Sequence, residues 1–153
     1  MPLLLPIRLA LAIGFLTICT SCGSNTPRTS SVSGVVEMDG KPLTGFDKGS
    51  VVLTPSNGRL AVGAIDSQSG TFQLQTYSPG DGAIVGPARV AVIAIKETSS
   101  SSADDRYAAG RSILPEHFSD RDNSGLECEV KPGNANVFRI VLSTDGSGKI
   151  ETQ

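Results

Sequence analysis

The amino-acid sequence predicts an all-β protein, a seven-stranded antiparallel β-sandwich. Beyond residue 31, no segment places an apolar residue at every third or fourth position, whereas apolar and polar residues alternate repeatedly, as in half-buried strands. The 153-residue chain contains 17 Gly and 9 Pro, which supply turns between the alternating segments. Strands with one apolar face must bury it, so two sheets are expected to pack face to face.

Four strands are expected in the first half of the chain. The first is followed by Asp39-Gly40, a strong turn signal. In the fourth, Phe72 and Leu74 alternate with polar residues, and a polar turn joins this strand to its predecessor as a hairpin. The expected strands cover residues 32–38, 50–55, 60–65 and 71–75.

Three more strands are expected after a loop at 77–87 that is rich in Gly and Pro. Residues 90–95 form a continuous apolar run with many β-branched side chains, which indicates a central strand covered on both faces. Leu126, Cys128 and Val130 alternate with two glutamates, and apolar residues recur in the same way over 137–142. These patterns predict strands at 90–95, 126–130 and 137–142.

Two segments interrupt this pattern. Residues 97–112 contain four consecutive Ser and little apolar content, so we expect an exposed loop insertion between strands. Phe118 is expected to help pin the chain back onto the sandwich after it. Residues 144–153 are rich in Gly and polar side chains and are expected to form a flexible tail. The folded domain is therefore expected over residues 32–143.

The first 22 residues have the composition of an export signal. Arg8 precedes a ten-residue apolar run, which is too short to span a bilayer but suits the central region of a signal peptide. The run leads into Cys19-Thr20-Ser21-Cys22, which resembles the cleavage site of bacterial lipoproteins. The resemblance implies removal of residues 1–21 and a diacylglycerol on Cys22. Cys19 as the acceptor and an ordinary cleaved signal are the alternatives.

A lipid on Cys22 would place the protein in the cell envelope, facing the periplasm or the cell surface. Residues 22–31 are rich in Ser and Thr and contain no large apolar side chain, so we expect a flexible tether. Gly23 stands where an Asp favours inner-membrane retention in some bacteria, which favours the outer membrane. Only Cys128 remains as a thiol, so no intramolecular disulfide is expected.

Three motifs carry a family resemblance. The segment 32–36 leads into the turn at 39–43. A polar turn at 66–72 that ends in Phe72 is followed by a Pro- and Gly-containing loop at 78–83 before the central strand, and residues 114–120 precede 124–126. In their order and spacing, these motifs resemble the small lipoproteins with a carboxypeptidase regulatory-like domain that are abundant in planctomycete bacteria. The resemblance implies a transthyretin-like (Ig-like) sandwich. It also implies no enzymatic activity, because this domain is an accessory, non-catalytic part of carboxypeptidases.

The chain offers little catalytic chemistry. Its single histidine, His117, lies in a Pro-Glu-His-Phe segment, and no Ser stands in a nucleophile-elbow pattern. Cys128 lies on the apolar face of its strand, where a thiol behaves as a small hydrophobe. The formal net charge of −2 provides no basic field for nucleic acid. We therefore expect no enzyme, no cofactor and no nucleic-acid partner.

Two weaker candidate sites remain. Asp120, Asp122 and Ser124 resemble the start of a calcium loop, but the twelfth position is Lys131 where a bidentate Glu is required. A polar turn is the competing interpretation, and no dedicated metal site is expected. Tyr77 and Tyr107 fall in loops and are the best candidates for exposed aromatic side chains at a ligand site.

Two functions follow from these observations. The first is a non-enzymatic, lipid-anchored protein of the cell envelope with a structural or protein-interaction role, whose partner is an unidentified envelope protein. The alternative is a small-ligand or carbohydrate-binding module, accessory to a secreted enzyme, with a glycan as the partner.

Overall fold

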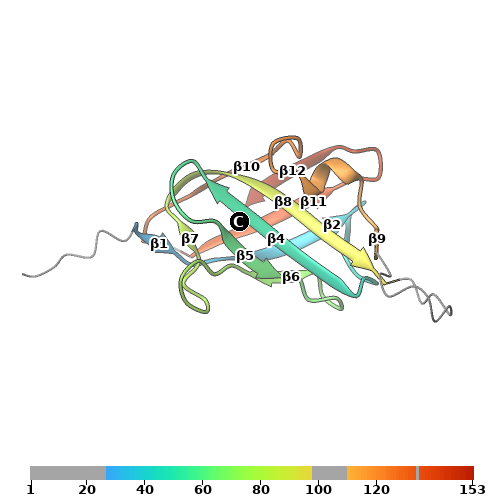
Figure 1. Ribbon diagram of the computed structural model, residues 1–153, viewed down its shortest axis with the longest axis horizontal. Helices are drawn as coiled ribbons and strands as arrows, with labels where there is room; N and C mark the ends of the chain where they lie inside the picture. Colours follow the sequence, from blue (N-terminus) through green and yellow to red (C-terminus); the bar gives the residue numbers. More distant parts are fainter. Residues whose placement is uncertain (1–26, 98–109, 134) are drawn as a thin grey trace, which may run out of the picture.

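A computed structural model describes residues 27–97, 110–133 and 135–153, which form an all-β protein with one short 3₁₀-helix, η1 (Glu116–Ser119) (Figure 1). The strands are β1 (Thr29–Ser30), β2 (Val32–Met38), β3 (Lys41–Pro42), β4 (Lys48–Pro55), β5 (Ala61–Ala64), β6 (Thr71–Gln73), β7 (Ala83–Ile84), β8 (Gly86–Lys96), β9 (Arg111–Ser112), β10 (Leu126–Val130), β11 (Asn136–Leu142) and β12 (Gly148–Thr152). No helix in the described ranges is long and apolar enough to cross a membrane.

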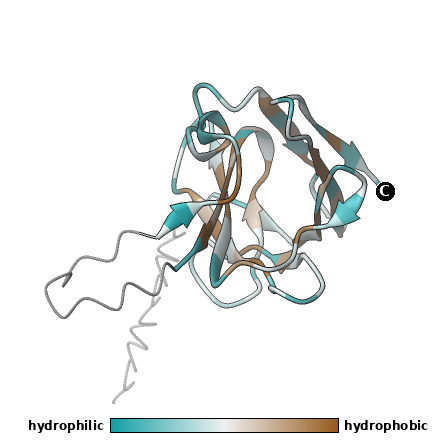
Figure 2. Cartoon of the chain, turned by 90° about the vertical axis from the view of Figure 1, so that its right-hand side faces the viewer, coloured by the Kyte–Doolittle hydropathy of each residue, from teal (hydrophilic) through white to brown (hydrophobic). Residues whose placement is uncertain are grey.

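Two five-stranded sheets make up most of the fold. One has the order β10-β8-β4-β5, with β9 paired to the end of β8. The other has the order β12-β11-β2-β3, with β6 paired to β2, and β1 and β7 form a small separate pair. Both five-stranded sheets contribute apolar side chains to one buried cluster, and their apolar segments surround a common interior in Figure 2. This cluster includes Val36, Leu53, Val92, Phe138 and Ile140.

Each of the seven predicted strands has a counterpart. β10 and β2 have the predicted bounds, and β8 begins four residues earlier than the predicted central strand. The Asp39-Gly40 turn joins β2 to β3, and both of its residues have positive φ angles, 49° and 79°, as a tight hairpin turn requires. Alternation located the strands that have one face in the core, and the continuous apolar run located the central strand, in which Val90, Ala91 and Val92 are all buried.

The prediction of purely antiparallel pairing is wrong at one place. β11 runs parallel to β2 over the whole length of both strands, from Asn136 opposite Val32 to Leu142 opposite Met38. The predicted hairpin of residues 60–65 with 71–75 is present only as two isolated bridges, because β5 joins one sheet and β6 the other. Period-2 alternation identifies a buried face but does not identify the neighbouring strand.

The predicted domain borders also change. The flexible tail over 144–153 is wrong, since β12 pairs with β11 over five residues and Ile150 packs against the core. The predicted tether at 22–31 ends early, because Thr29 and Ser30 pair with β7 and Ser30 is buried. Of the predicted insertion at 97–112, residues 98–109 lie outside the described part of the chain, and Arg111 and Ser112 form β9.

An ion-pair cluster stabilises the outer face of the second sheet. Arg139 on β11 donates two hydrogen bonds to Glu37 on β2, at 2.9 and 2.7 Å, and a third to Glu151 on β12 at 3.2 Å. The hydrogen bonds from Arg139 hold the pKa of Glu37 below its ordinary value of 4.5. The three strands are thus joined by side chains as well as by their backbone ladders.

Acid is expected to weaken this cluster. A carboxylate with a lowered folded-state pKa stabilises the fold fully above its ordinary pKa, and this contribution is lost as the pH falls through the lowered value. We therefore expect the free energy of unfolding of the wild type to fall more steeply below about pH 4.5 than that of Arg139→Ala, in which the pKa of Glu37 is no longer lowered. Urea unfolding from pH 7 to pH 3 measures this, and equal pH slopes in the two proteins would contradict the assignment.

Candidate functional site

Tyr77 lies on a loop that a single carboxylate holds in place. The carboxylate of Asp81 accepts hydrogen bonds from the backbone N–H groups of Thr76, Tyr77 and Ser78, at 2.7, 2.9 and 3.1 Å. Thr76 also donates its hydroxyl to the carbonyl of Gly82 at 2.8 Å. Partial burial raises the pKa of Asp81, but the backbone hydrogen bonds outweigh it and keep the pKa below its ordinary value of 3.8. The loop is therefore a turn fixed by hydrogen bonds, and it exposes Tyr77 to solvent.

The side chain of Tyr77 is 43% exposed and lies next to a cation. The guanidinium carbon of Arg59 is 5.9 Å from the centre of the Tyr77 ring, within the range of a cation–π interaction. Arg59 and residues 75–79 border a shallow hollow of about 210 Å³. The structure thus brings Tyr77 together with Arg59. Tyr107 and Cys22, the other predicted site residues, lie outside the described residues.

Asp120, Asp122 and Ser124 each have a hydrogen-bond or ion-pair partner within the protein. Asp120 accepts hydrogen bonds from the backbone of Asp122 at 2.9 Å and from the side-chain amide of Asn123. Asp122 pairs with the guanidinium of Arg89. Ser124 is buried and donates to the carbonyl of Val90 at 2.6 Å. Their arrangement is that of a hydrogen-bonded turn, which was the competing interpretation of the calcium-like motif.

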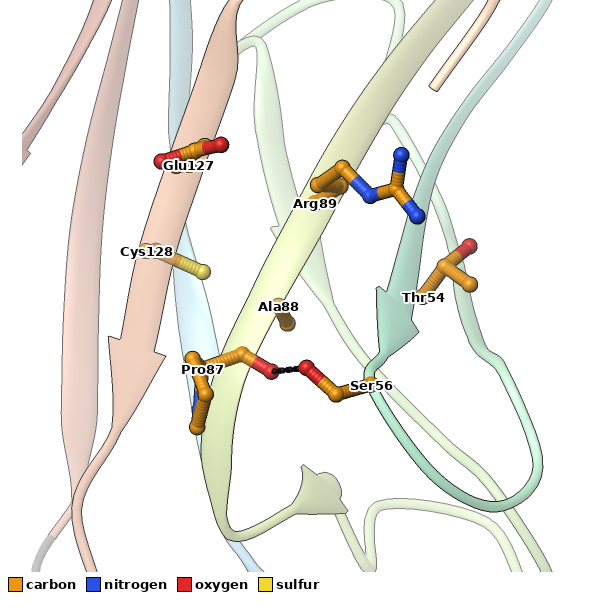
Figure 3. A pocket seen from close by; sticks show the side chains of 7 residues that line it. All are labelled: Thr54, Ser56, Pro87, Ala88, Arg89, Glu127 and Cys128. Atoms are coloured by element: carbon orange, nitrogen blue, oxygen red, sulfur yellow. Dashed lines mark hydrogen bonds between the residues drawn. The ribbon is translucent and has the colours of Figure 1, made fainter. Parts of the chain in front are cut away.

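A second hollow, of about 380 Å³, lies across β4, β8 and β10 (Figure 3). Arg89 and Glu127 are opposite each other in the β8–β10 register, yet the guanidinium of Arg89 points toward the side of Thr54. At the rim, the hydroxyl of Ser56 donates to the carbonyl of Pro87 at 3.4 Å. The lining residues are Thr54, Ser56, Pro87, Ala88, Arg89, Glu127 and Cys128. Among these lining residues, Arg89 is paired with Asp122, and no hydroxyl or thiol is hydrogen-bonded to a basic side chain.

Cys128 is half-buried and packs against the core, as its position on the apolar face predicted. Burial raises the pKa of the Cys128 thiol to about 12. The thiolate is the reactive form, and at pH 8 its fraction is on the order of 10⁻⁴. This thiol is therefore a packing group in the folded protein.

Cys128 is expected to be inert toward thiol reagents until the protein unfolds. In a chain with Cys19→Ser and Cys22→Ser, Cys128 is the only thiol. We expect its reaction with an aromatic disulfide reagent at pH 8 to be at least about 100-fold slower in the native protein than in urea. Equal rates in the two states would show that the thiol is exposed.

His117 makes contacts that join two parts of the fold. Its Nε2 atom lies 3.0 Å from the carbonyl oxygen of Gly146, and its ring centre is 4.1 Å from that of Phe118. The ring therefore links η1 to the turn between β11 and β12. Within residues 27–97, 110–133 and 135–153, no group of three or more His, Cys, Asp or Glu side chains is arranged to hold a metal ion.

Arg59 and Leu60 were not predicted as site residues. The sequence interpretation placed Leu60 at the start of a strand, but β5 begins at Ala61, and Leu60 is 42% exposed. No sequence pattern marks Arg59, because its relation to Tyr77 depends on the approach of two loops.

In comparisons with known proteins, no family model, no curated protein and no solved structure matches the chain.

Proposed function

We propose that this chain is a lipid-anchored protein of the bacterial cell envelope, without enzymatic activity, that serves a structural or protein-interaction role. The observation that carries the proposal is the apolar run that leads into Cys19-Thr20-Ser21-Cys22, the sequence that resembles a lipoprotein cleavage site. The described chain begins at Pro27, five residues after Cys22, and reaches its first strand pair at Thr29. Five residues span at most about 18 Å, so a lipid on Cys22 would hold the domain close to the membrane.

The fold supports the family resemblance on which this proposal also draws. Two five-stranded sheets share one core, and the Asp39-Gly40 turn joins β2 to β3. We propose that the two sheets are a transthyretin-like sandwich of this kind. The parallel β2–β11 pair and β12 are additions to the pattern that the sequence predicted.

Cell fractionation tests the anchor. We expect the full chain, and its Cys19→Ala variant, in the membrane fraction of a bacterial host. Cys22→Ala should shift to the soluble envelope fraction, because it loses the proposed acceptor of the acyl chains. Cys19→Ala is the matched control, since it alters a neighbouring cysteine and retains Cys22. Membrane association that survives Cys22→Ala would contradict the proposal.

A small-ligand or carbohydrate-binding role is the second candidate, and exposed Tyr77 beside Arg59 favours it. An aromatic ring at the border of a hollow can stack on a sugar face, and a cation can hold a carboxylate of an acidic glycan. Saturable binding on a glycan panel, lost in Tyr77→Ala and kept in Tyr77→Phe, would support this role. Absence of binding over the panel would leave the first proposal as the better one.

A further inference from the structure

One end of the molecule carries an unusual set of exposed side chains. Among the described residues, the two exposed large hydrophobic side chains are Leu60 and Tyr77, at 42% and 43%. Val62 and Gln75 form an antiparallel bridge. Leu60 lies two residues before Val62 and Tyr77 two residues after Gln75, so both continue the paired segments in the same direction. The hydroxyl of Thr76 donates to the carbonyl of Gly82, so this end of the paired segments lies near β7, which is at the left of Figure 1.

Three cations lie at the same end of the molecule as this apolar pair, and one of them, Arg59, is next to Tyr77. Gly58, which precedes Arg59, lies against Ile84 of β7 and near Pro27. The carbonyl of Arg28 accepts a hydrogen bond from Val85. Lys131 donates its N–H to Asn136, whose own N–H donates to Ser31 beside β1. The cationic and apolar residues together form what we term the entry face: Arg28, Arg59, Leu60, Tyr77 and Lys131.

The charges of the entry face are available to a partner. Arg28, Arg59 and Lys131 are exposed, and none of them makes an ion pair within the described part of the chain. The carboxylate of Asp81 is directed into its own loop by three backbone hydrogen bonds. Two exposed acidic side chains, Glu127 and Glu129, lie on the neighbouring strand β10, opposite Arg89 and Pro87 of β8.

The opposite end of the molecule has a different character. Five carboxylates lie there, where β2, β5, β8 and β11 end and β4 begins; these are Asp39, Asp47, Asp66, Glu97 and Asp145. Lys48 at this end is paired with Glu97 at 2.7 Å, and Lys41, Lys96 and Arg111 are also exposed here, so carboxylates exceed cations by one. An anionic surface would therefore favour contact with the entry face over this end, which gives the domain a preferred orientation.

We infer that the entry face lies against the membrane surface, with Leu60 and Tyr77 in the interfacial layer and the three cations against anionic lipid headgroups. This inference rests on the proposed anchor, because a lipid on Cys22 holds the chain within about 18 Å of Pro27. Tyr places an apolar ring and a polar hydroxyl at the boundary between lipid and water. Each cation close to anionic lipid strengthens binding about fivefold.

A single introduced tryptophan reports on this contact, because the chain contains no Trp. The protein is extracted from its membranes as the variant Tyr77→Trp and reconstituted into vesicles that contain phosphatidylglycerol. We expect a blue-shifted emission that lipids with brominated acyl chains quench. Gln68→Trp is the matched control in the turn between β5 and β6, where Gln68 is exposed, and its emission should be unaffected.

A second experiment tests the entry face independently of the lipid anchor. The chain carrying Cys22→Ala is added to vesicles with and without phosphatidylglycerol. We expect weak, salt-sensitive binding to the anionic vesicles. Neutralisation by Arg28→Gln, Arg59→Gln and Lys131→Gln should weaken it on the order of 100-fold. If this binding is found and the wild-type chain proves to carry no lipid, the entry face is supported and the anchor is refuted.

Two results would overturn the inference. The first is an anchored protein in which Tyr77→Trp is no more quenched than Gln68→Trp, because the anchor would then hold while the face stays in water. The second is a change in the emission of Tyr77→Trp that a soluble glycan produces and vesicles do not, because the ligand would then be a sugar.

Discussion

Replacing Phe118 by Ala is expected to lower the free energy of unfolding by about 3–5 kcal/mol, because it empties a fully buried aromatic position. The side chain of Phe118 has no exposed surface and lies in the core cluster that both sheets share. Gly148 lies against its ring, as a β-carbon added there would be 2.8 Å from Phe118 Cε1. Phe118 thus packs η1 against β12, the strand that the sequence interpretation did not predict.

Urea unfolding of Phe118→Ala and Glu116→Ala measures this effect. Glu116 is exposed in the same short helix, and its side chain should contribute within about 0.5 kcal/mol. A loss below about 1 kcal/mol for Phe118→Ala would mean that η1 is not packed into the core.

Replacing Gly82 by Ala has the second large expected effect. Gly82 has a φ angle of +83°, which costs a residue with a β-carbon about 1–2 kcal/mol. A β-carbon there would also collide with the carbonyl of Ser30, where β1 passes the loop. We expect a total loss above about 2 kcal/mol, since either the loop or β1 must move.

Gly80→Ala is the matched control for the collision. Gly80 has a similar φ angle of +75°, but a β-carbon there would meet only the flexible side chain of Gln73, at 3.2 Å. It should therefore show the backbone cost of about 1–2 kcal/mol alone. Equal losses in the two variants would show that β1 does not lie against this loop.

The strands were predictable because their faces are chemically different. β10 shows why: Leu126 and Val130 are buried, Glu127 and Glu129 are exposed, and the pattern locates the strand without any knowledge of its neighbours. The same argument predicted the face of Cys128.

Strand neighbours were not predictable in the same way. The parallel pairing of β11 with β2 joins residues 104 positions apart, as at Asn136 and Val32, and leaves no mark on either local pattern. β12 was missed because its short Gly-Lys-Ile-Glu-Thr segment has only one apolar side chain. Its stability comes from the β11 ladder and from the pairing of Glu151 with Arg139.

The candidate surface was predictable only in part. Tyr77 follows from an aromatic residue in a Pro- and Gly-rich loop, and it is exposed as expected. Arg28, Arg59 and Lys131 come from three separate segments, and only the fold brings them to the end where the chain enters. A charge count over the whole chain, −2, hides this local excess of cations.

The intact mass of the protein extracted from its native membranes tests the proposed anchor most directly. The account predicts a polypeptide that begins at Cys22 and carries the added mass of a diacylglyceryl group, and it predicts that Cys22→Ala lacks this addition. An unmodified chain in the soluble fraction would contradict the anchor. The same domain would then be a soluble envelope binder, and the glycan panel would become the next experiment.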